Sequence, residues 1–325
     1  MTRTILTPER ERLAWVAVAF LAIILGLGAA VLLQPWTRDF LDWRRVLQAG
    51  ATWGAGGNPY ALSGYFYTPA LAVVASRLGD WTIPLLVAGE VAIVAWLSPR
   101  HPLAVLAMLA WPPVWGDIAL GNETILLVGA LAVAVRGDSV PRGTLLGFGL
   151  ALVPKPMFVP VLLWLAVHRR RSLAGVVAAG AAVTLPAALL TGLYPEFVAA
   201  LLRGIDPAFA GNVGITATVP WAGPVVSVVA ILVALAVVRR DEAGLLVAGL
   251  AGTFMGTYVG LYAPVLPAGV LQRYARLRPG RTLAVGAAGA VSWLALPFFA
   301  AVALVAVLVD RATGRRDPGP GDPRY

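Results

Sequence analysis

Long apolar runs, separated by short polar or arginine-containing breaks, cover most of the chain. A helix that crosses a bilayer needs about 20 mainly apolar residues and satisfies its backbone polar groups internally. We therefore expect an all-α, polytopic membrane protein with about 10–12 transmembrane helices. The runs lie at 13–33, 82–98, 102–119, 123–136, 143–154, 155–168, 173–191, 219–238, 243–256, 257–271, 282–295 and 297–309.

The polar stretches indicate one transmembrane domain at 1–310. The longest of them, 34–81, contains paired acids, paired arginines and aromatic residues, and we expect it to form a first outer loop with short helices. The segment 311–325 is rich in Pro, Gly and Arg, a composition typical of disorder, and is expected to be a cytoplasmic tail.

Arginines set the expected topology. The run 13–33 follows Arg3, Arg10 and Arg12 and is too long for a signal-peptide core, so its N-terminal end is expected inside. If the short segment 66–78 does not cross the membrane, most basic residues fall on the cytoplasmic side, as the positive-inside rule requires. We therefore expect a multi-pass protein of the cell (plasma) membrane, with both termini cytoplasmic and the polar side chains at the outer face.

Composition supports the membrane class and argues against several others. Hydrophobic residues make up 59% and charged residues 13% of the chain, against roughly 45–50% and about 25% in soluble domains. The absence of Cys excludes disulfides and thiol chemistry, and two His argue against a His-built metal site. The net charge of +9 comes from short arginine clusters, so no nucleic-acid partner is expected. No nucleotide motif or metal motif is present, so neither a cofactor nor a metal is expected.

Acidic and basic residues are paired in the first polar loop. Asp39 and Asp42 are three residues apart, so they share a face if the segment is helical. Arg44 and Arg45 follow within one turn. A carboxylate beside guanidinium groups can act as a general base next to an anionic lipid head group. The alternative is a solvated loop whose charges only keep it out of the bilayer.

Lys155 is the only lysine in the chain and lies between two prolines in an apolar stretch. A buried cation costs roughly 2.5–3.5 kcal/mol on insertion scales, and such a residue is a functional candidate by default. The prolines break the helix there, which indicates backbone lining a cavity or the interface. Anion binding is the favoured interpretation, and a lysine that reaches water from a helix–helix turn is the alternative.

The run at 123–136 opens with polar residues. Asn122 and Thr124 can cap a helix and Glu123 suits its dipole, while a ligand-binding role fits the same residues. Glu90 lies inside another apolar run and needs a partner that the sequence does not name.

The order of these motifs resembles the GT-C glycosyltransferases, and within them the family 87 (DUF2029) polyprenol-phosphate-mannose-dependent mannosyltransferases. The resemblance covers roughly residues 12–275. It rests on Asp42-Trp43 with Gly57-Asn-Pro-Tyr60, on Tyr67-Thr-Pro69, on Gly121-Asn-Glu-Thr124, on Gly143 to Lys155-Pro156 followed by Arg169-Arg-Arg171, and on Gly211-Asn212.

The resemblance implies a GT-C-like fold and an inverting transfer of a hexose, mannose above all. The donor would be a polyprenyl-phosphate sugar, the acceptor a lipid or glycan hydroxyl, and the active site would face outside among membrane lipids. Asp42, or Asp39 in its place, would be the general base. The donor phosphate would be held by Lys155, Arg44 and Arg45. Sugar or acceptor would be contacted by Tyr60, Asn122, Glu123, Asn212 and Tyr258.

Two other functions remain open. A transporter or flippase of a lipid-linked or anionic substrate would also use a lysine in a broken helix, although no internal repeat is visible. A catalytically degenerate GT-C relative would retain the fold without the reaction.

Overall fold

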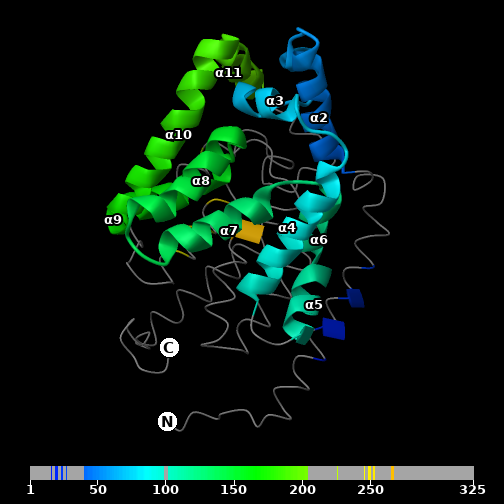
Figure 1. The fold of residues 1–325 in the computed structure, drawn as a ribbon. Coiled ribbons are helices and arrows are strands. Elements are labelled where there is room, and N and C mark those ends of the chain that lie inside the picture. The colour runs from blue at the N-terminus through cyan, green and yellow to red at the C-terminus, as the bar shows by residue number, and fades with distance from the viewer. Residues whose placement is uncertain are drawn as a thin grey trace.

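The computed structural model describes residues 40–98 and 102–203, with isolated positions between 16 and 27 and between 225 and 266. Within them the secondary structure is helical and contains no strand, which confirms the all-α prediction. The elements, shown in Figure 1, are α2 (Leu41–Gly54), η1 (Pro59–Ala61), α3 (Pro69–Ala75), α4 (Thr82–Leu97), α5 (Pro102–Ala110), α6 (Pro112–Leu120), α7 (Thr124–Val135), α8 (Val140–Leu152), η2 (Pro156–Phe158), α9 (Val159–His168), α10 (Arg170–Thr191) and α11 (Tyr194–Arg203).

One helix of the described residues is long and apolar enough to cross a membrane by itself. This helix is α10, with 22 residues and a mean hydropathy of 2.1. The helices α6 and α7 would make a second span if they are counted together, although they meet at an angle of 115°. The other apolar helices are shorter than the expected spans. The full series of crossings therefore stays a prediction.

The run expected at 102–119 is divided into α5 and α6 at Trp111. Trp111 has an extended backbone, with φ −67° and ψ 125°, and Pro112 and Pro113 follow it. Proline lacks an N–H donor and disfavours the helical conformation of the residue before it. The prediction of one continuous helix here was wrong, because this proline pair ends the first helix and begins the second.

The segment 66–78 contains only α3, which has seven residues. At 1.5 Å per residue this helix is roughly 10 Å long, well short of the bilayer core of about 30 Å. Its length agrees with the expectation that this segment does not cross. Together with α2 and η1, it provides the short helices that were expected in 34–81, within the part of this segment that the structure describes.

Helices α7 and α8 form an antiparallel hairpin, and α10 runs parallel to α8 (Figure 1). Asn122 precedes α7 and Lys155 follows α8, so both lie at one end of the hairpin, which we call the site end. Arg136 and Arg142 lie at the turn that connects the two helices, which we call the arginine end. Asn122 and Lys155 therefore lie at one end of the hairpin, and these two arginines lie at the other.

Glycines allow α8 and α10 to pack closely. A side-chain carbon at Gly143 would collide with the carbonyl oxygen of Ser172, and one at Gly147 with the backbone of Val176. From the other side, Gly175 lies against the carbonyl oxygen of Val140. Small residues four apart are a common device for close helix contact in membranes.

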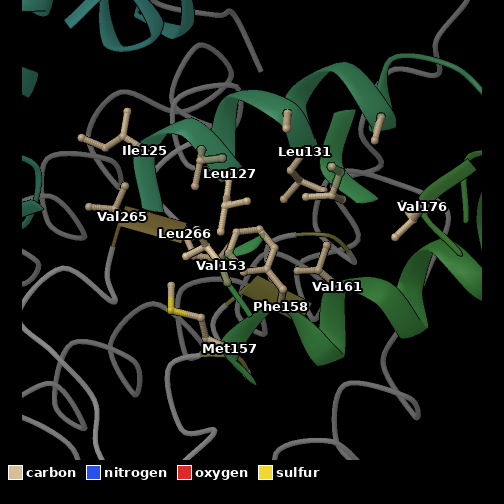
Figure 2. Packing of buried hydrophobic residues seen from close by; sticks show 14 of the residues in the cluster. Ile125, Leu127, Leu131, Val153, Met157, Phe158, Val161, Val176, Val265 and Leu266 are labelled. Atoms are coloured by element: carbon tan, nitrogen blue, oxygen red, sulfur yellow. The ribbon is translucent and has the colours of Figure 1, made fainter. Parts of the chain in front are cut away.

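The main hydrophobic core lies between α7, α8 and α9. Figure 2 shows Phe158 of η2 beneath α7, with Val161 on α9 nearby. Phe158 and Val161 are fully buried. Val265 and Leu266, from a distant part of the sequence, complete this cluster. The break between α8 and α9 is therefore held in place on its apolar side.

Candidate functional site

Asp42 reaches the site end because the start of α2 packs on the turn after α6. Gly121 ends α6 in the left-handed conformation, with φ 65°, and a side-chain carbon there would lie 2.9 Å from Cβ of Trp43. Phe40, before α2, also has a positive φ of 52°, a conformation that costs about 1–3 kcal/mol for such a residue. Trp43 Nε1 donates to Thr82 Oγ1 at 2.8 Å and ties α2 to the start of α4.

Asn122 connects the predicted base with the predicted cation. Its Nδ2 donates a hydrogen bond of 2.8 Å to Asp42 Oδ2. Its Oδ1 accepts from Lys155 Nζ at 2.9 Å and from Thr124 Oγ1 at 2.7 Å. Asn122 is only 1% exposed. The carboxylate and the ammonium group are therefore held at opposite ends of one buried amide.

Lys155 faces the protein interior. Its side chain is 10% exposed, and its Nζ lies 5.8 Å from the centre of the Tyr67 ring. The neighbouring Thr68 fixes the end of α8, because its Oγ1 donates to the carbonyl oxygens of Ala151 (2.8 Å) and Leu152 (3.0 Å). The Tyr-Thr-Pro element therefore supports the lysine. The alternative of a lysine that reaches water does not fit this geometry.

A second carboxylate faces the lysine. Glu123 Oε2 lies 3.8 Å from Lys155 Nζ, a distance typical of an ion pair without a short hydrogen bond. Its side chain is 5% exposed. Glu123 therefore stands beside the predicted site and helps to balance the buried charge of the lysine.

The start of α7 is capped by a residue that the sequence analysis did not single out. Asp117 is fully buried, and its Oδ2 accepts from the backbone N–H of Ile125 at 2.9 Å. Of the two interpretations left open for Asn122 and Thr124, capping is not seen, because their side chains bond to each other and to the site instead. An acid inside an apolar run was the signal that would have identified Asp117.

Glu90 on α4 is the other fully buried acid. Its two carboxylate oxygens accept no hydrogen bond from the part of the chain that the structure describes. The charged groups that act on it are Asp117 and Glu123, so it faces the same interior. The sequence could not name its partner, and none is seen among the residues that the structure describes.

Tyr60 lies in an aromatic cluster beside the site. Its hydroxyl donates to the carbonyl oxygen of Tyr67 at 2.8 Å, and its ring packs on Tyr65 and Phe197. The hydroxyl of Tyr65 donates to the carbonyl oxygen of Thr68 at 3.0 Å. Burial raises the pKa of both tyrosines well above the usual value, so both remain donors. These contacts stabilise the loop that supports Lys155.

The remaining predicted residues are not brought into the hydrogen-bond network. Arg45 covers Gly64 of the first loop, and Arg44 is exposed on α2. Asp39, Asn212 and Tyr258 lie outside the described residues, as does the tail 311–325. The structure therefore joins Asp42, Asn122 and Lys155, places Glu123 beside them, and leaves the arginines at the periphery.

The arrangement combines a partly exposed carboxylate with a buried cation. A carboxylate can accept a proton from a hydroxyl group, and an ammonium group can stabilise an oxyanion that forms nearby. Among the residues that the structure describes, no group of His, Asp or Glu has the geometry of a metal site. The chain was also compared with known proteins, and no family model, no curated protein and no solved structure matches it.

Proposed function

We propose that the protein is a membrane glycosyltransferase that moves a hexose, in the first instance mannose, from a polyprenyl-phosphate donor to a lipid or glycan hydroxyl. The observation that carries this proposal is the joint hydrogen bonding of Asp42 and Lys155 to Asn122. An inverting transfer needs a base on one side of the sugar carbon and a positive group near the departing phosphate. A pair of such groups fixed by one amide meets both needs.

The proposed step conserves atoms and charge. Asp42 takes the proton of the acceptor hydroxyl, whose oxygen bonds to the anomeric carbon of the sugar. The bond from this carbon to the phosphate oxygen breaks, and the electron pair leaves with polyprenyl phosphate. Lys155 stabilises that phosphate, with Arg44 and Arg45 on α2, at the periphery of the site, as further cations. The resemblance to the GT-C family supports the choice of donor.

The test is transfer by the full-length protein in nanodiscs, given radiolabelled polyprenyl-phosphate mannose and a lipid extract. Asp42→Asn is expected to lower the rate by about 10²–10⁴, the usual contribution of a general base. Asp80→Asn is the matched control, because Asp80 is an exposed acid of the same loop and its loss is expected to leave the rate unchanged. Equal activity of wild type and Asp42→Asn would contradict the assignment of the base.

A second candidate function, an ion-coupled transporter, is favoured by a different observation. Glu90 and Asp117 are fully buried acids in apolar helices, and intramembrane acids often belong to proton or ion pathways. Uptake of a lipid-linked sugar into protein-containing vesicles, lost in Glu90→Gln, would support transport. Transfer of label without uptake, retained in Glu90→Gln, would support the transferase.

A further inference from the structure

The arginine end of the α7–α8 hairpin carries a concentration of positive charge that the proposed reaction does not use. Residues from the end of α7, the start of α8 and the start of α10 meet there. We call this surface the arginine patch, and its members are Arg136, Arg142, Arg169, Arg170 and Arg171.

Contacts between the two segments show that the patch is one surface. Asp138 Oδ1 accepts hydrogen bonds from the backbone N–H groups of Arg171 (2.8 Å) and Ser172 (3.0 Å). Ser172 Oγ donates to the carbonyl oxygen of Gly137 at 2.9 Å. The guanidinium group of Arg142 lies against the same glycine. The turn before α8 and the start of α10 are therefore fixed side by side.

The charge of the patch is not neutralised within the described residues. None of its arginines forms an ion pair there, since the one ion pair joins Lys155 and Glu123 at the site end. The neighbouring Asp138 uses one carboxylate oxygen on backbone N–H groups at the start of α10. The patch therefore has several guanidinium groups available for an external anion.

Tryptophans hold two of the arginines near the helix ends. The guanidinium carbon of Arg136 lies 4.2 Å from the centre of the Trp96 ring, and that of Arg169 lies 5.9 Å from the centre of the Trp164 ring. Trp96 is 44% exposed at the end of α4. Tryptophan beside arginine at the end of apolar helices is typical of the membrane–water interface.

We propose that the arginine patch binds the phosphate groups of anionic phospholipids in the leaflet opposite the candidate site. Guanidinium groups bind phosphate through two parallel hydrogen bonds, and basic clusters next to membrane helices attract anionic lipids. The patch includes the start of α10, which has the length and hydropathy of a membrane span, and the start of a span lies at the lipid head groups. This proposal does not depend on the transferase activity.

The test compares two charge-matched double variants of the full-length protein in detergent. Arg170→Gln with Arg171→Gln removes exposed arginines of the patch, and Arg77→Gln with Arg203→Gln removes exposed arginines elsewhere. Phosphatidylglycerol and phosphatidylcholine are titrated in turn, and bound lipid is counted by native mass spectrometry. With about 1 kcal/mol for each arginine, the patch variant is expected to bind phosphatidylglycerol roughly thirtyfold more weakly than wild type.

Three results would overturn the proposal. The first is an equal loss of phosphatidylglycerol affinity in the Arg77→Gln and Arg203→Gln control variant. The second is binding of phosphatidylcholine that is as tight as binding of phosphatidylglycerol. The third is that inorganic phosphate alone stabilises the protein as much as phosphatidylglycerol does, which would indicate a site for soluble anions. The double variant Arg170→Lys with Arg171→Lys is the control for misfolding. It keeps the charge but loses paired hydrogen bonding, and its affinity is expected between those of wild type and the Gln variant.

Discussion

The amide of Asn122 has only one orientation that satisfies its neighbours. Lys155 Nζ and Thr124 Oγ1 both donate to its oxygen, so its nitrogen must face the Asp42 carboxylate. Asn122 therefore sets the position of the base relative to the cation. We describe it as a positioning residue in the proposed reaction.

Replacing Asn122 by Ala is expected to lower the transfer rate by about 10²-fold, because small displacements of a base reduce catalysis by that order. The thermal midpoint and donor binding provide the check on folding. Thr124→Val is the control, since it removes one donor to the amide but leaves both Asp42 and Lys155 in contact with it. Full activity of Asn122→Ala would show that Asp42 is oriented by something else.

Replacing Tyr65 by Phe removes a buried hydroxyl and leaves the carbonyl oxygen of Thr68 without this donor. That oxygen still accepts from the backbone N–H of Leu71 at 3.1 Å, so the change removes one of its two hydrogen bonds, worth about 0.5–1.5 kcal/mol. We expect a corresponding loss in the free energy of unfolding, measured by denaturant titration in detergent. An unchanged unfolding curve would mean that water replaces the lost hydrogen bond.

The sequence was informative about Asp42 and Lys155 because both residue types are out of place in their surroundings. It could not show that Asn122 lies between them, since Asn122 and Asp42 are 80 positions apart in the sequence and meet only in the folded chain. Asp117 was overlooked for a different reason. The hydropathy of 102–119 suits one uninterrupted helix, in which an acid has no evident role, whereas in the structure Asp117 caps the next helix.

Among the elements, the pair α8 and α10 depends most directly on glycine. The two helices approach so closely that backbone atoms of one fill the space where side chains of the other would be. This contact fixes the first half of α8, whereas Thr68 fixes its end, three residues before Lys155.

Gly147→Ala is expected to destabilise the protein by about 1–3 kcal/mol, because a methyl group there meets the backbone of Val176, which cannot move aside. Gly180→Ala on α10 is the matched control. Its nearest neighbour, the carbonyl oxygen of Gly147, would be 3.9 Å away, so the helix is expected to gain about 0.5–1 kcal/mol. Thermal unfolding in detergent compares the two, and equal effects would contradict the close packing.

Element boundaries were predictable where proline marks them. The break at Lys155 was expected from its two flanking prolines, and the structure confirms it. Pro112 and Pro113 give the same signal, whereas the hydropathy of 102–119 suits a single helix, and the structure breaks at the prolines. Periodicity and hydropathy report which residues are buried. The missing backbone N–H of a proline determines where a helix stops.

At the scale of the whole molecule, the candidate site and the arginine patch lie at opposite ends of the α7–α8 hairpin. The expected orientation, in which the arginine end faces the cytoplasm, stays a prediction. The number of crossings and the positions of the termini remain predictions.

The orientation can be measured directly because the chain contains no cysteine. Ser63→Cys, in the first loop, is expected to react with a membrane-impermeant maleimide in intact cells. Val140→Cys, at the arginine end and 44% exposed, is expected to react only after the membrane is permeabilised. The reverse pattern would invert the topology, and labelling of both in intact cells would place the two ends on one side.

The short length of the hairpin has a consequence for the surrounding lipid. Helices α7 and α8 have 12 and 13 residues, which correspond to roughly 18–20 Å at 1.5 Å per residue. This is about 10 Å less than the hydrocarbon core of an ordinary bilayer. If the hairpin crosses the membrane as predicted, this mismatch is expected to thin the bilayer around it and to bring lipid phosphates toward Asn122. The proposed transfer is therefore expected to be faster in short-chain lipids than in long-chain lipids.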